Sequence, residues 1–151
     1  MYTKQEASAL RQAFWTTFGK YMSPVLSADG MKTNWVSYKT GIKYLQFSME
    51  AGTKSASIAI VINHPDPVTR RRYYQQFVQL RSFFHETLGE QWKWQPEAVN
   101  EHGQDISSIS VSLQPSNIFD QAQWPAVISF FKPRIMALDE FWCMAKEGFE
   151  R

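Results

Sequence analysis

The sequence predicts an α+β protein in which helices cover one face of an antiparallel sheet. Two observations indicate this class: apolar residues alternate with polar ones over 45–50 and 56–62, and they recur at helical spacing before and after that region. Alternation places every second side chain on one side of a strand, whereas spacing of three and four places apolar side chains along one helix face. The expected order is helix, three strands, helix, two strands, helix, which gives a five-stranded, mainly antiparallel sheet with three main helices packed on it.

The first helix is expected from Lys4 to Met22. Thr3 and Glu6 have the spacing of a capping box, in which each side chain bonds a free backbone amide at the start of a helix. The helix then keeps one apolar face, formed by Ala7, Leu10, Phe14, Phe18 and either Tyr21 or Met22.

Three strands are expected after a loop over 23–33. The first covers 34–38, and the turn residues 39–41 precede a second strand centred on Phe47. Residues 51–54 turn the chain into the third strand, whose apolar residues are Ala56, Ile58, Ile60 and Ile62.

The second helix is expected to begin at Pro67, because Asp66 is a favoured N-cap and proline suits the first helical position. Gly89 should close it as a left-handed cap. Its buried stripe is Tyr73, Phe77, Leu80, Phe84 and Leu88.

Two further strands are expected around 91–95 and 106–113, followed by helical sequence from Asn117 onward. Pro133 should kink or split that last helix, because proline removes one backbone donor. With no linker or repeat, residues 1–151 are expected to form a single α+β domain. The apolar stripe of the last helix is Val127, Phe131, Ile135, Leu138, Trp142, Ala145 and Phe149.

Composition limits the function classes. Sixteen Lys and Arg against fourteen Asp and Glu leave a net charge of +2, too weak for a protein that coats nucleic acid. Any such contact has to be local. The single cysteine, Cys143, is expected to be a buried, inert thiol. Without a signal-peptide pattern or an apolar run of ~20 residues, the sequence predicts a cytoplasmic protein with no membrane contact.

Four segments spread along the chain stand out together: 10–15 (LRQAFW), 34–41 (NWVSYKTG), 62–66 (INHPD) and 128–142 (ISFFKPR to FW). Their combination resembles a bacterial family, the domain of unknown function 4268. Members occur alone or at the end of longer proteins whose other domain resembles restriction-type nucleases, so the resemblance implies an accessory role near DNA. It supplies no catalytic or binding residue.

Catalytic and metal-binding motifs are missing from the sequence. A restriction-type nuclease needs Asp or Glu two positions before Lys, and no acidic residue here has that spacing. The histidines His64, His85 and His102 lie far apart, without carboxylates or cysteines at ligand spacing. We therefore predict no catalytic residue, metal or cofactor.

A cluster of positive charge stands at the start of the second helix, formed by Arg70, Arg71 and Arg72. Positive side chains oppose the helix dipole there, whereas free amides and guanidinium groups together suit a phosphate. These arginines are the candidate anion or nucleic-acid site. The alternative is that they fan around the helix and are solvated or paired with nearby acids.

A second candidate is Trp92, Lys93 and Trp94, where a strand would place two indoles on one face and a cation on the other. Tryptophan is favoured at partner interfaces and as a stacking platform, so these residues are a candidate interface. Core packing of the two indoles is the alternative.

Two function classes remain. The favoured one is a non-catalytic binding or accessory module that docks a protein or nucleic-acid partner, linked through the resemblance to DNA-processing or defence systems. The alternative is a small enzyme, a hydrolase or one acting on a small molecule, whose site assembles only in three dimensions, for example from His64, Asp66 and Asp105. The binding module is favoured because it needs no missing motif. The sequence leaves the partner open, and a homo-oligomer as well.

Overall fold

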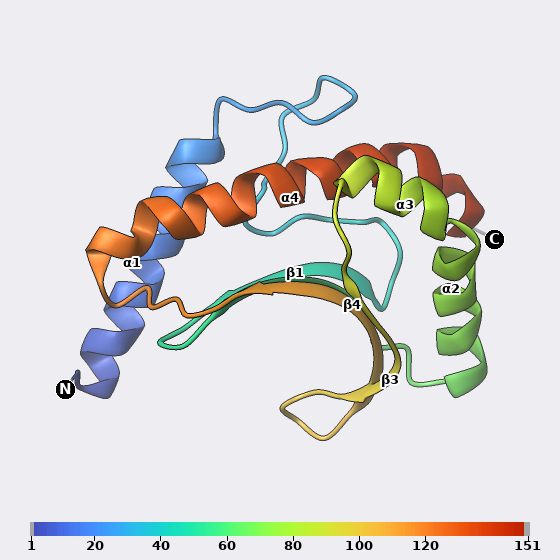
Figure 1. Cartoon of the computed structure of the whole chain (residues 1–151), viewed down its shortest axis with the longest axis horizontal. Helices are drawn as coiled ribbons and strands as arrows, with labels where there is room; N and C mark the ends of the chain where they lie inside the picture. The colour runs from blue at the N-terminus through green and yellow to red at the C-terminus, as the bar shows by residue number, and fades with distance from the viewer. Residues whose placement is uncertain (1, 150–151) are drawn as a thin grey trace.

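The computed structural model describes residues 2–149, and within them four α-helices pack with a single four-stranded sheet (Figure 1). Figure 1 shows α4 lying along the sheet, with α1 at one end and α2 at the other. The elements in chain order are α1 (Lys4–Met22), β1 (Leu45–Ala51), β2 (Ala56–Ile62), α2 (Pro67–Gln79), α3 (Arg81–Leu88), β3 (Lys93–Val99), β4 (Asp105–Leu113), η1 (Gln121–Gln123), α4 (Trp124–Ala145) and η2 (Lys146–Phe149).

The sheet has the strand order β1-β2-β4-β3, and all neighbouring strands are antiparallel. Its register sorts side chains by face, because residues directly opposite each other point to the same side. One row, on the helix side, is Phe47, Ile60 and Ile109; the next, on the other side, is Ser48, Ala59 and Ser110.

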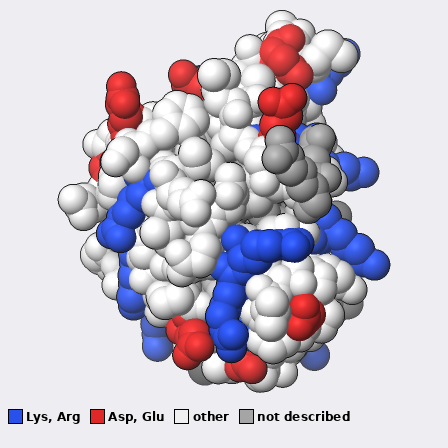
Figure 2. All heavy atoms as spheres, turned by 90° about the vertical axis from the view of Figure 1, so that its right-hand side faces the viewer, with Lys and Arg blue, Asp and Glu red and all other residues white. Residues whose placement is uncertain are grey.

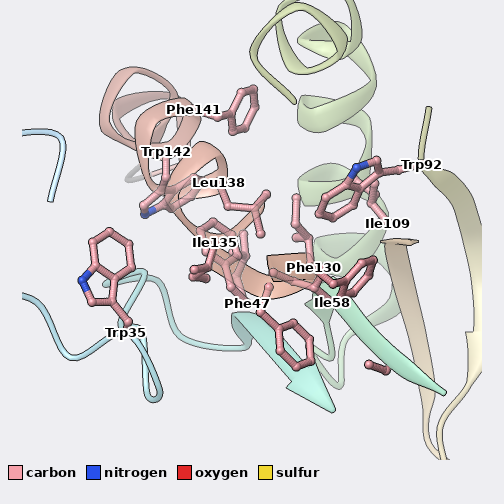
Figure 3. Packing of buried hydrophobic residues seen from close by; sticks show 14 of the residues in the cluster. Trp35, Phe47, Ile58, Trp92, Ile109, Phe130, Ile135, Leu138, Phe141 and Trp142 are labelled. Carbon is pink, nitrogen blue, oxygen red and sulfur yellow. The ribbon is translucent and has the colours of Figure 1, made fainter. Parts of the chain in front are cut away.

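The helix side of the sheet forms the core with α4. Ile135, Leu138 and Trp142 on this helix lie opposite Phe47 and Ile58 on the strands (Figure 3). All seven apolar positions predicted for the last helical region are buried, which confirms its 3.6-residue period. Their burial explains why α4 continues through Pro133 instead of splitting there as one alternative predicted: the contacts outweigh one missing hydrogen bond.

The predicted strand over 34–38 is wrong, and the sheet therefore has four strands rather than five. This segment belongs to a loop between α1 and β1. Its aromatic side chains anchor it to other parts of the chain instead of pairing it with a strand. The buried Trp35 donates its indole N–H to the carbonyl of Val25, and Tyr38 bonds to Asp139 of α4.

The predicted second helix is two helices, which raises the number of α-helices from three to four. The chain leaves the helical conformation at Leu80, where φ is −97° and ψ is 11°, without a glycine or proline. Both helices keep contact with α4 across the break, since Phe77 on α2 and Phe84 on α3 each pack against Phe141.

The other boundaries follow the sequence. Thr3 and Glu6 form the predicted capping box of α1, and Gly89 closes α3 with a left-handed φ of 69°. The last two strands lie close to their predicted positions, with β3 shifted two residues at its start.

No helix within residues 2–149 covers the opposite side of the sheet (Figure 1). The β3–β4 hairpin bends away from α4, and its turn curls beneath this open face. The side chains of the open face are small and polar, chiefly Ser48, Ser57, Ser108, Ser110 and Ser112.

Candidate functional site

The N-terminus of α2 is capped by its own sequence. Asp66 accepts hydrogen bonds from the hydroxyl of Thr69 at 2.7 Å and from the backbone N–H groups of Val68 and Thr69. The Thr69 hydroxyl, helped by these amides, lowers the pKa of the Asp66 carboxyl below its usual value. Because Asp66 already bonds these amides, an anion at this end of α2 has to be held mainly by guanidinium groups.

The three arginines of the predicted cluster have different surroundings. Arg70 donates from Nη1 to the carbonyl oxygen of His64 at 2.7 Å. The guanidinium of Arg72 lies 5.6 Å from the ring centroid of Tyr73. Arg71 is exposed and lines a hollow between α2 and β3.

Acidic partners do not neutralise these arginines. Within residues 2–149 the ion pairs are Arg134 with Glu90 and His102 with Glu101. The alternative in which the arginines pair with nearby acids therefore does not describe this part of the chain.

Arg72 is one end of a row of three aromatic side chains with a cation at each end, which we call the basic–aromatic ladder. The Nζ of Lys43 lies 5.1 Å from the ring centroid of Tyr44. The centroids of the Tyr44 and His64 rings are 4.8 Å apart. The His64 ring lies 6.3 Å from that of Tyr73, which carries Arg72. Figure 2, which looks at the side where α2 lies, shows Lys and Arg side chains running across this face.

Three separate segments position the ladder. Lys43 and Tyr44 end the loop before β1, His64 follows β2, and Arg72 and Tyr73 lie on α2. The backbone N–H of Asp66 donates to Nδ1 of His64 at 3.0 Å, so a neutral His64 ring carries its proton on Nε2.

Tyr44 has a strained backbone. Its φ of 66° lies in the left-handed region, which costs a residue other than glycine about 1–3 kcal/mol. Its carbonyl accepts a hydrogen bond from the N–H of Asn63 at 3.0 Å, and its side chain is 37% exposed. Strain of this kind concentrates at functional sites, and here it presents an aromatic ring between a cation and a histidine.

The second predicted site is divided between core and surface. Trp92 is buried against Phe84 and donates its indole N–H to Glu90 at 2.9 Å, as the core alternative expected. Trp94 is partly buried, with the guanidinium of Arg81 4.9 Å from its ring. Lys93 is exposed and points to the open face of the sheet, in the row of Ser110.

The residues proposed for the enzyme alternative do not together line the hollow between α2 and β3. Asp105 lines the hollow between α2 and β3, whereas neither His64 nor Asp66 does. In the part of the chain that the structure describes, no group of three or more His, Cys, Asp or Glu side chains is arranged to hold a metal ion.

The prediction that Cys143 is buried is wrong, because its side chain is exposed on α4. The buried positions of this part of α4 are Leu138, Phe141, Trp142 and Ala145, and position 143 falls on the opposite face. No helix among residues 2–149 is both long and apolar enough to cross a membrane.

Fold and surface together define an α+β protein with a four-stranded sheet and an exposed cluster of cations and aromatic rings. The model of a family described as a domain of unknown function, DUF4268, matches residues 10–146. The chain belongs to this family, and the whole basic–aromatic ladder lies inside the matched region. Neither a curated protein nor a solved structure matches the chain significantly.

The sequence predicts only part of this surface. Arg72 belongs to a charged run, but Lys43, Tyr44 and His64 carry no motif. They become a site only because the loop before β1 and the end of β2 meet α2.

Proposed function

We propose that this protein is a non-catalytic module that binds the phosphate backbone of a nucleic acid through the basic–aromatic ladder, with Arg70 and Arg71 beside it. The observation that carries the proposal is a row of three rings with a cation at each end on one partly exposed surface, where no described carboxylate pairs with the cations.

The chemistry of the ladder suits this ligand. Guanidinium groups that lack an acidic partner are available for charge-assisted bonds to phosphate oxygens. The rings of Tyr44 and Tyr73 each hold a cation at the surface, Lys43 on the first and Arg72 on the second. A contact of this kind is local, so it agrees with a net charge of only +2.

The role that we propose is accessory, beside a DNA-processing or defence enzyme. In that setting the module supplies nucleic-acid contacts, while another protein or domain supplies the chemistry. This division of labour is consistent with a described surface rich in cations and without a metal-binding group of acids and histidines among residues 2–149.

The test is a titration of a fluorescent single-stranded oligonucleotide, followed by anisotropy at low salt. The ladder-side variant is Arg70→Gln/Arg71→Gln/Arg72→Gln. The control is Lys4→Gln/Lys20→Gln/Lys54→Gln, which removes the same charge from exposed positions on α1 and in the β1–β2 turn.

The arginine variant should bind at least about tenfold more weakly than the wild type, because each lost phosphate contact removes counterion release. The control should change the affinity by less than about threefold. Equal losses in both variants would show that only overall charge matters, and a wild type that does not bind would overturn the proposal.

A further inference from the structure

Asn63, the residue after β2, lines three neighbouring hollows of the surface. The first, about 440 Å³, contains Lys43 and Tyr44 of the ladder. The second, about 810 Å³, lies between α2 and β3. The third, about 490 Å³, is the open face of the sheet, which we call the serine trough.

Five serine side chains of the sheet line the serine trough, together with turn residues such as Asn100 and Gln104 that bond each other. The hydroxyls of its serines make no hydrogen bond to any protein group that the structure describes. Ala59 and Val61 lie between them on β2, and the β3–β4 turn curls beneath (Figure 1). The five serines are Ser48, Ser57, Ser108, Ser110 and Ser112.

The trough begins beside the ladder. The β2 side chains on the open face are Ser57, Ala59 and Val61, and Asn63 continues the same alternation. Asn63 is also bonded through its backbone N–H to Tyr44. Six residues of strand span about 20 Å, so the trough extends that far from the ladder.

The hollow between α2 and β3 and the serine trough, which both begin at Asn63, differ in the charges that line them. In the hollow between α2 and β3, Glu97 and Asp105 line the same cavity as Arg70 and Arg71, so positive and negative charges are mixed there. The serine trough carries mainly hydroxyls and amides. Its carboxylates, Glu50 and Glu101, lie at the hairpin end of β1 and in the β3–β4 turn.

The side chain of Asn63 has unused hydrogen-bonding capacity. Its Oδ1 atom is buried and has no hydrogen-bond partner among residues 2–149. Asparagine amides pair with base edges through two hydrogen bonds, and serine hydroxyls bond to base edges of either polarity. An unpaired amide beside unpaired hydroxyls therefore fits a ligand with mixed donors and acceptors.

We infer that the serine trough binds the bases of a single-stranded nucleic acid whose backbone lies on the basic–aromatic ladder. Asn63 and the trough hydroxyls hydrogen-bond to the base edges. A duplex does not fit this role, because its Watson–Crick edges are already paired. The inference rests on the proposed function, since the ladder supplies the backbone contact.

The test compares four ligands of about 12 nucleotides: single-stranded DNA, RNA of the same sequence, the DNA duplex, and a single strand of abasic sugar-phosphate. The trough is blocked by Ala59→Phe, which places a ring in its middle without touching the ladder. The control is Ala9→Phe at an exposed position of α1. Thermal unfolding checks each fold, and Ser48→Phe, in the same row as Ala59, replaces a blocking variant that does not fold.

The wild type and Ala9→Phe should bind the better of the two single strands about tenfold more tightly than the abasic strand and the duplex. That better strand identifies the ligand as DNA or RNA. Ala59→Phe should lose this preference and keep its affinity for the abasic strand, because the ladder is intact.

Two results would overturn the inference while leaving the proposed function in place: equal binding of normal and abasic strands by the wild type, or a preference that survives in Ala59→Phe. A wild type that binds none of the four ligands would overturn both.

Discussion

The hydroxyl of Tyr38 donates a 2.5 Å hydrogen bond to the carboxylate of Asp139. The same carboxylate accepts the backbone N–H of Ala28 at 2.7 Å, so one buried side chain of α4 holds two points of the loop before β1. That loop ends in Lys43 and Tyr44. Asp139 therefore helps to position the basic–aromatic ladder, although it lies outside it.

Replacing Tyr38 with Phe should lower the free energy of unfolding by about 1.5–3 kcal/mol at pH 7, because a hydrogen bond to a charged group is lost. Urea unfolding of both proteins measures the difference. The ring remains in place to stack on Phe47, so the change reports on the hydroxyl.

The pair formed by Tyr38 and Asp139 also predicts that the stability of the fold depends on pH in the alkaline range. Burial, and then the hydrogen bond to Asp139, raise the pKa of Tyr38 well above its ordinary value of 10.0. The folded protein thus holds this proton more tightly than the unfolded chain. The stabilisation that the protonated Tyr38 hydroxyl gives to the folded state is complete below pH 10 and is lost as the pH rises above 10. The stability difference between wild type and Tyr38→Phe should narrow above that pH, and a constant difference would contradict the assignment.

Phe77 tests the core on the helix side of the sheet. It is fully buried, and its ring contacts Phe141, Trp142 and Phe149, the last at 4.6 Å. Phe77→Ala should cost about 3–5 kcal/mol in denaturant unfolding. Val68→Ala, on the exposed face of the same helix, should cost under about 0.5 kcal/mol. Similar costs for the two would mean that α2 presents a different face.

The strained backbone at Tyr44 predicts that a substitution there can weaken oligonucleotide binding without lowering the stability of the fold. Tyr44→Gly removes the ring but relieves the left-handed backbone, so stability should stay within about 1 kcal/mol of the wild type while oligonucleotide binding weakens. Tyr44→Ala removes the same ring and keeps the strain. It should bind as weakly as Tyr44→Gly and unfold more easily, and the reverse order of stability would argue against strain.

Local sequence patterns predicted the elements whose signals are local. The capping box of Thr3 and Glu6, the alternation in β2 and the stripe of α4 are each confirmed. Residues 34–38 failed because Trp35 and Tyr38 are anchored by distant parts of the chain, and short aromatic segments carry no sign of that.

Of the candidate sites, the arginine cluster lies where the sequence predicted, at the start of α2. Its partners in the ladder were not predictable, because Lys43 and His64 approach it only through the packing of the loop and the end of β2. Trp92 differs from the arginine cluster. The sequence predicts it as part of an interface, whereas packing places its ring in the core.

The salt dependence of oligonucleotide binding tests most directly whether the ladder contacts phosphates. For a single strand, the slope of log affinity against log salt changes by about 0.7 for each phosphate contact. Lys43→Gln/Arg72→Gln should therefore flatten the slope by about 1.4 relative to the wild type. Lys4→Gln/Lys20→Gln on α1, with the same loss of charge, should leave the slope unchanged. Identical slopes for the wild type and the ladder variant would contradict a phosphate-binding ladder.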